Sequence, residues 1–242
     1  MFEIMTPYKA YILGLISTDG CIYKYTTSIE LQHRDEGVLF NISNIFYDEG
    51  YNPKISRTTK KGRVYTRLRI HSKRLAEELC LLGITPRKSY TVPFLSNISY
   101  IHEYVRGLID GDGNIEIRRN NIEITFHSAS ERLIEGYISY LQSIGIKPKK
   151  ANRHGGVLRV SVYANEAKTL YSKCYYVKCL SIPRKRDKIL SFTKSINPKL
   201  WSEEDQKYLK DNLGVLTYPQ IAKDLDKSLK SVQMKALRMK RQ

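Results

Sequence analysis

The pattern of apolar and polar residues in this chain occurs twice. Apolar residues recur at helical spacing and predict helices over residues 7–19, 35–49, 72–83, 99–112 and 130–144. Between these stretches apolar and polar residues alternate with period two, as at Ile29 and Leu31 in the first half and Ile122 and Ile124 in the second, which predicts half-buried strands. The pattern therefore predicts an α+β fold of two αββαββα halves with antiparallel sheets.

An internal repeat supports this division. The segment GLISTDG, which begins at Gly14, returns as GLIDGDG from Gly107, and Pro86-Arg87-Lys88 returns as Pro183-Arg184-Lys185. The first helix of each half ends at Asp-Gly, where we expect the glycine to take the left-handed conformation that ends many helices. We therefore predict repeats at 1–96 and 97–193, a linker at 194–199 and a separate domain at 200–242.

The last segment has its own pattern of three short helices. Ser202, Thr217 and Ser228 are candidate N-caps. The predicted small core consists of Trp201, Leu209, Ile221, Leu225, Val232 and Leu237. The motifs WSEED, TYPQIAKDLDKS and SVQMKAL resemble a Myb/SANT-like helix-turn-helix module, whose third helix would contact DNA through Lys230, Gln233, Lys235 and Arg238. A protein-binding three-helix tail is the alternative.

Charge narrows the class of partner. The chain carries 41 Lys and Arg against 24 Asp and Glu, a net charge of +17, which favours a polyanion. No apolar run approaches the ~18 to 20 residues of a membrane-spanning helix, and the N-terminal residues lack a signal-peptide pattern. We therefore expect no membrane partner and a location in the cytoplasm or an organellar matrix. The four cysteines form no C-x-x-C pair, so any metal chemistry would rest on carboxylates.

The polar faces of the predicted strands are candidate nucleic-acid contacts. They combine donors to phosphate with donors and acceptors for base edges, at Tyr65, Arg67, Arg69, His71, Glu123, Thr125, His127, Arg159, Ser161 and Tyr163. Simple exposure to water would also produce polar strand faces. The repeated Pro-Arg-Lys elements add possible phosphate contacts at Lys88, Arg184, Lys185 and Arg186, for which solvated surface charge is an equal alternative.

Two aspartates end the repeated helices in an unfavourable position. Asp19 and Asp112 lie in the last turn, where the helix dipole favours cations. If Gly14 and Gly107 let the two helices pack closely, both carboxylates emerge together and repel each other. A hard divalent cation such as Mg²⁺ or Mn²⁺ relieves both penalties. We therefore expect a metal ion, and not a lysine, to be the partner of Asp19 and Asp112.

The same residues carry a family resemblance. ILGLISTDG (12–20) and VRGLIDGDG (105–113) both resemble the LAGLIDADG motif of homing endonucleases, and the resemblance extends over about residues 5 to 192. It implies that the motif helices form the interface between halves whose sheets make a DNA-binding saddle. It also implies that Asp19 and Asp112 are the catalytic, metal-binding acids, with added ligands from the carbonyls of Thr18 and Gly111. Ser17 departs from the motif where Asp110 keeps it, and we interpret that position as structural.

The resemblance also predicts an activity. It implies a monomeric, site-specific homing endonuclease that makes a double-strand break in a long DNA duplex, depends on a divalent metal and requires no protein partner. In this family basic residues near the end of each half's fourth strand often support catalysis, which suggests His71 and Lys73 in the first half. An intron RNA maturase, with RNA as partner, and a DNA-binding regulator on the same scaffold are the alternatives.

Overall fold

The computed structural model describes residues 1–118, 121–188, 201 and 203–239. The chain divides into two compact units, Met1–Phe192 and Thr193–Gln242. The predicted linker at 194–199 lies outside the described residues, and the predicted domain limits stay predictions. Within the described ranges, no helix has the length and apolar character needed to cross a membrane.

The first unit contains two copies of one topology. The first copy runs α1 (Pro7–Asp19), β1 (Gly20–Tyr23), β2 (Thr26–Gln32), α2 (Glu36–Asp48), β3 (Lys54–Lys60), β4 (Arg63–His71) and α3 (Lys73–Leu81). The second runs α4 (Ile101–Asp112), β5 (Gly113–Arg118), β6 (Asn121–Ser128), α5 (Glu131–Ser143), β7 (Lys149–His154), β8 (Val157–Tyr163) and α6 (Ala164–Cys174). The sheets have the orders β1-β2-β4-β3 and β5-β6-β8-β7, and all pairs are antiparallel. The αββαββα prediction is confirmed.

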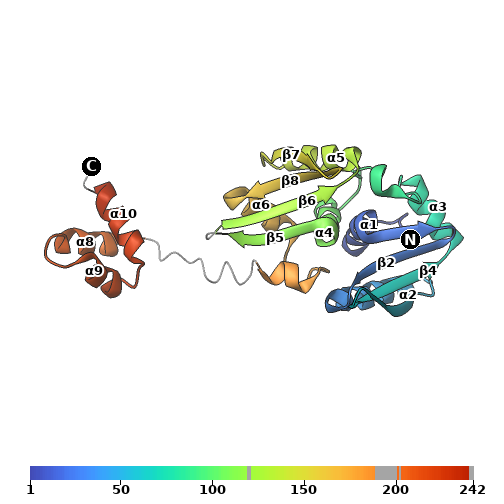
Figure 1. Ribbon diagram of the computed structural model, residues 1–242, viewed down its shortest axis with the longest axis horizontal. Helices are drawn as coiled ribbons and strands as arrows, with labels where there is room; N and C mark the ends of the chain where they lie inside the picture. The colour runs from blue at the N-terminus through green and yellow to red at the C-terminus, as the bar shows by residue number, and fades with distance from the viewer. Residues whose placement is uncertain (119–120, 189–200, 202, 240–242) are drawn as a thin grey trace. The chain divides into compact units, whose positions relative to one another are not determined.

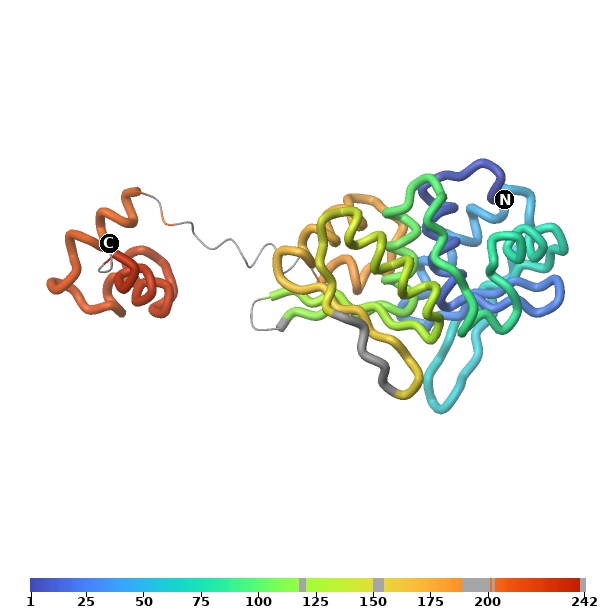
Figure 2. The backbone as a smooth tube through the Cα atoms, turned by 90° about the horizontal axis from the view of Figure 1, so that it is seen from above, coloured from blue at the N-terminus to red at the C-terminus, as the bar shows by residue number. Residues whose placement is uncertain are grey.

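Local sequence explains where these elements start and which face they bury. The hydroxyl oxygens of Ser72 and Ser130 accept hydrogen bonds from the backbone N–H groups three residues on, which caps α3 and α5. In β2 the buried residues are Thr27, Ile29 and Leu31, so one strand face joins the core and the other is left polar. Figure 2 shows the β3–β4 hairpin extending from the body on the side away from the N-terminus.

The two motif helices pack against each other at glycines. Figure 1 shows α1 and α4 side by side between the two sheets. A Cβ atom at Gly14 would lie 2.1 Å from the carbonyl oxygen of Tyr104, and one at Gly107 would lie 2.3 Å from that of Tyr11. Because only a hydrogen fits at either site, the predicted close approach of the backbones at Gly14 and Gly107 is confirmed.

The glycines that end the motif helices differ from the prediction. Gly20 and Gly113 have φ of −79° and −88° and extended backbones, so neither takes the left-handed cap conformation. The expectation was wrong because each glycine is already the first residue of a strand. Glycine is needed there because a side chain would not fit and not because of its conformation. A Cβ at Gly20 would lie 2.3 Å from the carbonyl oxygen of Ile16 in the preceding turn.

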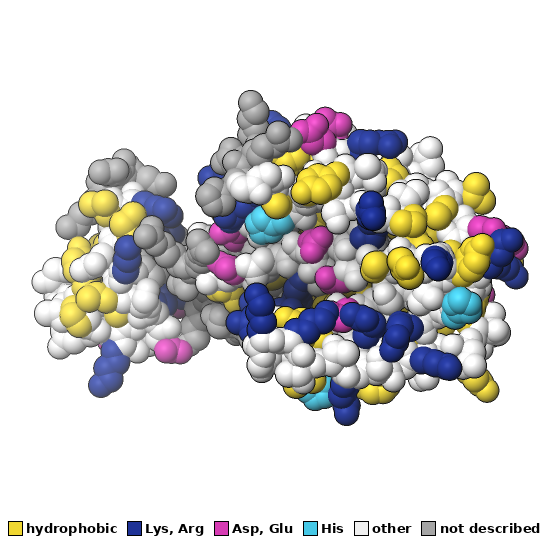
Figure 3. Space-filling model, turned by 45° about the vertical axis from the view of Figure 1, so that its right-hand side comes forward, with side chains coloured by type: hydrophobic (Ala, Val, Ile, Leu, Met, Phe, Trp, Pro, Cys, Tyr) yellow, Lys and Arg dark blue, Asp and Glu magenta, His cyan; other side chains and the backbone are white. Residues whose placement is uncertain are grey.

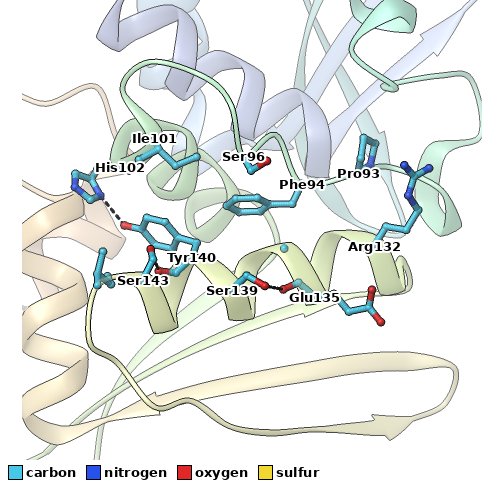
Figure 4. A pocket seen from close by; sticks show the side chains of 12 residues that line it. Pro93, Phe94, Ser96, Ile101, His102, Arg132, Glu135, Ser139, Tyr140 and Ser143 are labelled. Carbon is cyan, nitrogen blue, oxygen red and sulfur yellow. Dashed lines mark hydrogen bonds between the residues drawn. The ribbon is translucent and has the colours of Figure 1, made fainter.

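The segment that connects the repeats is anchored on α5. The Phe94 ring lies edge-on to Tyr104, with centroids 5.3 Å apart, and packs over Gly136, where a Cβ would lie 2.2 Å from that of Phe94. Beside it is a cavity of about 630 Å³, in which the Tyr140 hydroxyl and His102 Nδ1 are 2.6 Å apart (Figure 4). This cavity lies in the helical layer, since no strand residue lines it.

The second unit is a three-helix structure of α8 (Glu203–Asn212), α9 (Tyr218–Asp224) and α10 (Leu229–Met239). Thr217 and Gln220 form a capping box at α9, and the Ser228 hydroxyl caps α10. Leu209, Ile221 and Val232 are buried as predicted, but Leu237 is 46% exposed, because Ala236 and Met239 take the inward positions of α10. The predicted N-cap Ser202 lies outside the described residues.

Candidate functional site

The C-terminal ends of α1 and α4 meet, and each ends in an aspartate. A Cβ at Gly111 would lie 1.9 Å from Thr18 Oγ1 and 3.3 Å from Asp19 Oδ2, which shows how closely the two ends approach. Asp19 is half-buried, whereas Asp112 is accessible to solvent. The two motif acids therefore lie at adjoining helix ends, as the sequence predicts.

This environment disfavours charge on both acids. Burial, and then repulsion from Asp112, raise the pKa of Asp19 to about 7, although Lys185 and Lys88 act to lower it. Asp112 is accessible to solvent on one side, but the helix ends around it still withdraw it from water enough that this partial burial raises its pKa, against the lowering effect of Lys88, Lys185 and His127. A divalent cation between the carboxylates would remove the repulsion, so the pair fits such an ion.

Lys88 and Lys185 lie at these helix ends and not on the polar strand faces. Lys88 Nζ donates to the carbonyl oxygen of Thr18 at 2.8 Å. Lys185 Nζ lies within hydrogen-bond distance of four carbonyl oxygens, those of Ile109, Asp110, Gly111 and Gly113, which share its three N–H donors. Both lysine side chains are buried, so they are not placed for the predicted phosphate contacts. They instead cap α1 and α4, whose last carbonyl groups would otherwise lack hydrogen-bond donors. Burial lowers the pKa of Lys185 to about 8.

These contacts bear on the predicted metal ligands. The carbonyls of Thr18 and Gly111, proposed from the family resemblance, both accept from a lysine in this structure. In the described part of the chain, no group of three or more His, Cys, Asp or Glu side chains is placed to hold a metal ion. Side chains therefore offer a metal only two acids here, and oxygens of water, backbone or nucleic acid would complete its coordination.

Asp110, the other motif acid, is a structural residue, as its interpretation from the sequence predicted. Its buried carboxylate accepts from the Tyr11 hydroxyl at 2.9 Å, the Tyr175 hydroxyl at 2.8 Å and the Ile182 backbone N–H at 2.7 Å. Burial raises its pKa, while Lys185 and the three hydrogen bonds act to lower it. Asp110 thus joins α4 to α1 and to the segment after α6. The corresponding Ser17 donates to the carbonyl oxygen of Leu13 within its own helix.

We predict that Asp110→Asn destabilises the protein by about 3 kcal/mol, because the asparagine amide presents a donor to groups that are themselves donors and removes a charge beside Lys185. Urea unfolding followed by circular dichroism measures the change. The exposed Asp187→Asn serves as control and should change stability by less than about 0.5 kcal/mol. Equal stabilities of the two variants would contradict this role for Asp110.

A cavity lies next to Asp19 on the polar face of the first sheet. Asp19 lines a cavity of about 560 Å³ together with Cys21, Tyr23, Thr26, Ser28, Glu30, Arg67 and Arg69. Arg67 Nε donates to Glu30 at 2.8 Å, and Lys60 pairs with the same carboxylate. Partial burial raises the pKa of Glu30, but the hydrogen bonds from Lys60 and Arg67 outweigh it and hold that pKa below its usual range.

The strand register places His71 farther from Asp19 than Arg67 and Arg69, beside the cavity residue Thr26, whose Oγ1 is 3.1 Å from His71 Nδ1. His71 pairs with Thr26 at the turn end of the β1–β2 hairpin, whereas Gly20, next to Asp19, pairs with Ile29 at the other end. Lys73 follows His71, lies over the Tyr25 ring and pairs with Glu77. Arg67 and Arg69, and not His71 or Lys73, are therefore the basic residues of this strand that lie beside Asp19. Tyr65 is half-buried under Lys60.

A smaller cavity lies next to Asp112 at the end of β6 in the second sheet. It measures about 240 Å³ and brings Asp112 together with Lys88, His127 and Ser128. Arg159 lies along the strand face and donates to Ser161 at 3.3 Å and to Glu123 at 2.7 Å. Glu123, Thr125 and Ser161 are buried, so this face is more covered than that of the first sheet. The Tyr163 ring lies under Lys149, whose Nζ is 4.5 Å from its centroid.

Of the other residues predicted to contact DNA, some form ion pairs within the protein and others are exposed on its surface. Arg184 donates to both oxygens of the buried Asp35 at 2.9 Å and so ties the two repeats together, and half-buried Arg186 pairs with Asp187. On α10, Lys230, Gln233 and Arg238 are exposed, while Lys235 is half-buried with its ammonium 5.9 Å from the Trp201 ring centroid. Figure 3 shows a row of Lys and Arg side chains on one face of the first unit, with acidic side chains beside it.

Comparison with known proteins identifies the pattern of the first unit. The model of the LAGLIDADG-like domain matches the chain at residues 6–81 and again at 99–175. A structure of variants of the homing endonuclease I-DmoI has a TM-score of 0.57 at 15% identity and covers 76% of this chain and 97% of its own. I-DmoI has also been solved in complex with DNA and Ca, with a TM-score of 0.56 and 15% identity over 76% of this chain and 97% of its own.

Two further proteins resemble this chain over different shares of its length. Full-length DUF199/WhiA from Thermatoga maritima has a TM-score of 0.53 at 12% identity and covers 98% of this chain and 92% of its own. The DNA-directed RNA polymerase subunit Rpo1C of Methanocaldococcus jannaschii is 28% identical over 148 residues, which is 59% of this chain. The match spans only 17% of that subunit's length. These likenesses to solved structures show a shared fold.

Proposed function

Because this chain belongs to the family of LAGLIDADG-like domains, we propose that it is a site-specific DNA endonuclease that cuts both strands of a duplex target. One observation carries the proposal. Asp19 and Asp112 end two helices that are packed together; Asp19 lines a cavity on the polar face of the first sheet, and Asp112 lines one beside His127 at the end of β6. A duplex lying along both faces would present its backbone to the two carboxylates.

In the proposed mechanism Asp19 and Asp112 hold Mg²⁺ or Mn²⁺ and the two sheets hold the DNA. The cation supplies neutralisation of phosphate charge and a lowered pKa for an attacking water. Lys88 and Lys185 keep the helix ends in place through their carbonyl contacts. Arg67 and Arg69 beside Asp19, and His127 beside Asp112, supply donors to the sugar-phosphate backbone near each acid.

The target and the oligomeric state follow from the two repeats. One chain contains both acids, so a monomer suffices, and intron RNA and a protein partner are not required. The strand faces have diverged, with Arg67 and Arg69 beside one acid and His127 beside the other, so the target need not be palindromic. The residues after 200 would extend the site through Lys230, Gln233 and Arg238 on α10.

Incubation of the full chain with a randomised duplex library, followed by sequencing of the cleaved ends, tests this proposal. We expect one long sequence to be cut in Mg²⁺ or Mn²⁺, and no cutting in EDTA. Undiminished cleavage in EDTA would contradict the metal role. No cleavage in any divalent metal, together with retained site-specific binding, would favour the second candidate.

That second candidate is a DNA-binding protein without nuclease activity. It is favoured by the fold shared with full-length WhiA, which extends over 98% of this chain and so includes the helical unit at its end. The retained pair Asp19 and Asp112 favours the nuclease, since a binding protein has no need of paired acids at that position. A maturase role would instead appear as tighter binding to an intron RNA than to duplex DNA in gel-shift competition.

A further inference from the structure

Each of the two Pro-Arg-Lys segments contacts both repeats. The first segment covers residues 86–92 and the second covers 183–188. Through Lys88 the first segment caps α1, and through Lys185 the second caps α4, so each lysine serves the motif helix of its own repeat. Each segment also contacts the helix that follows the second strand of the other repeat, which is α5 for the first segment and α2 for the second. The two segments therefore join the repeats reciprocally.

The contacts with the opposite repeat fall on equivalent residues. Asp35 is the N-cap residue of α2, and Ser130 is the N-cap residue of α5. Arg184 Nε lies 2.9 Å from both carboxylate oxygens of Asp35. The Ser130 hydroxyl donates to the carbonyl oxygen of Val92 at 2.7 Å. Because Asp35 and Ser130 are buried, where the loss of a hydrogen-bond partner is costly, these contacts fix each segment against the opposite repeat.

Each segment also lies beside the motif acid of the opposite repeat. The first segment lines the cavity that contains Asp112, to which it contributes Lys88. Burial is the largest influence on the pKa of both acids and raises it, but the two lysines act on the acids in opposite order. Lys88 has the larger lowering effect on the pKa of Asp112, whereas Lys185 has the larger lowering effect at Asp19. Asp35, the partner of the second segment, also acts on Asp19, so this segment lies beside the acid of the first repeat.

We propose that the Arg184–Asp35 pair and Ser130 are positioning residues, and that each controls the cutting of one DNA strand. The pair holds the second segment beside Asp19, and Ser130 holds the first segment beside Asp112. A displacement of about 1 Å near reacting groups can slow a reaction about 100-fold. Loss of one contact should therefore disturb the surroundings of one acid and leave those of the other in place. This inference rests on the proposed function, because it concerns the balance between the two cuts.

Cleavage of the two strands, followed separately, tests the inference. A target duplex with a different fluorescent label on each strand is cut by the full chain in Mg²⁺ under single-turnover conditions. Arg184→Gln should slow the cutting of one strand about 10- to 100-fold relative to the other, and Ser130→Ala should slow the opposite strand. Both variants should therefore accumulate duplex that is nicked in a single strand, and the nicked strand should differ between them. Asp35→Asn should leave the same strand nicked as Arg184→Gln, because the two residues act as one pair.

Each variant has a matched control in the chain. Arg87 corresponds to Arg184 in the first segment, but it is exposed and forms no ion pair within the residues that the structure describes. Ser139 lies in the same helix as Ser130, but it is exposed and its hydroxyl donates within that helix. Arg87→Gln and Ser139→Ala should both keep the unaltered ratio of the two strand rates. Fluorescence anisotropy in EDTA should show unchanged DNA binding in Ser130→Ala, which separates positioning of the acids from DNA affinity.

The ratio of the strand rates separates positioning from general stability. A protein that is only destabilised would cut both strands more slowly by the same factor, so equal slowing would overturn the inference and leave the proposed function standing. Slowing of the same strand in Arg184→Gln and Ser130→Ala, or unaltered rates in both, would also overturn it. If the unaltered protein cuts no duplex, the proposed function fails and the inference fails with it. If Arg184→Gln does not fold, Asp35→Asn provides the same test, since asparagine keeps the shape of the aspartate.

Discussion

Replacement of either motif acid by asparagine is expected to abolish double-strand cleavage and leave DNA binding nearly unchanged. Asparagine keeps the size of Asp19 or Asp112 but removes the charge that would hold a divalent cation. A loss of about 4 kcal/mol of transition-state stabilisation corresponds to an about 1,000-fold slower reaction. The rate of cleavage of a target duplex under single-turnover conditions measures this effect, and fluorescence anisotropy in EDTA measures binding.

The chain contains a closely matched control. Asp48 is the last residue of α2, as Asp19 and Asp112 are the last residues of α1 and α4, but it is exposed, and its neighbour Glu49 pairs with Lys9 near the opposite end of α1. Asp48→Asn should cleave at the unaltered rate. If Asp19→Asn and Asp112→Asn also cut both strands at that rate, these acids do not hold the catalytic metal and the nuclease assignment fails.

The topology was predictable because it depends on local patterns. The alternation at Ile29 and Leu31 identifies the strand face that joins the core, and the return of the glycine-rich motif at Gly107 identifies the second copy. Each of these signals involves neighbouring residues or a short motif that returns with few changes. Helix limits such as Pro7–Asp19 and Glu131–Ser143 accordingly lie within a residue or so of those expected.

The partners of the motif helices were not predictable in this way. Lys88 reaches a carbonyl 70 residues earlier in the chain, and Lys185 reaches those of α4 from more than 70 residues away. The repeat of Pro-Arg-Lys was visible in the sequence, but a basic tripeptide looks the same on a surface and under a helix end. Only tertiary packing distinguishes a phosphate donor from a helix cap.

The role of Arg106 is likewise not predictable from local sequence. Arg106 is fully buried in α4, where it donates to the carbonyl oxygens of Cys174 and Leu180. Its guanidinium lies between the rings of Tyr11 and Tyr176, 5.3 Å from each centroid. From the sequence, a charged residue inside a motif helix is expected to be exposed unless its partners are known, and these partners come from two distant segments, α1 and residues 174–180.

The largest expected loss of stability comes from a methyl group between the motif helices. Gly14→Ala would place Cβ 2.1 Å from the carbonyl oxygen of Tyr104, and Gly107→Ala would place it 2.3 Å from that of Tyr11. Both obstacles are backbone atoms of the facing helix, so no side-chain rotation relieves the clash. The helices must separate, which opens the core and costs about 3 kcal/mol or more at each site.

Gly37→Ala provides the contrast, because Gly37 also lies in a helix but a Cβ there meets nothing within 4 Å. That variant should be unchanged or more stable by about 0.5 kcal/mol, since alanine favours a helix over glycine. Thermal unfolding of the three variants measures the differences. Separation of α1 from α4 would also part Asp19 from Asp112, so a Gly107→Ala protein that still folds should lose cleavage more completely than DNA binding. Equal stability of Gly14→Ala and Gly37→Ala would show that the helix contact is loose enough to accept a side chain.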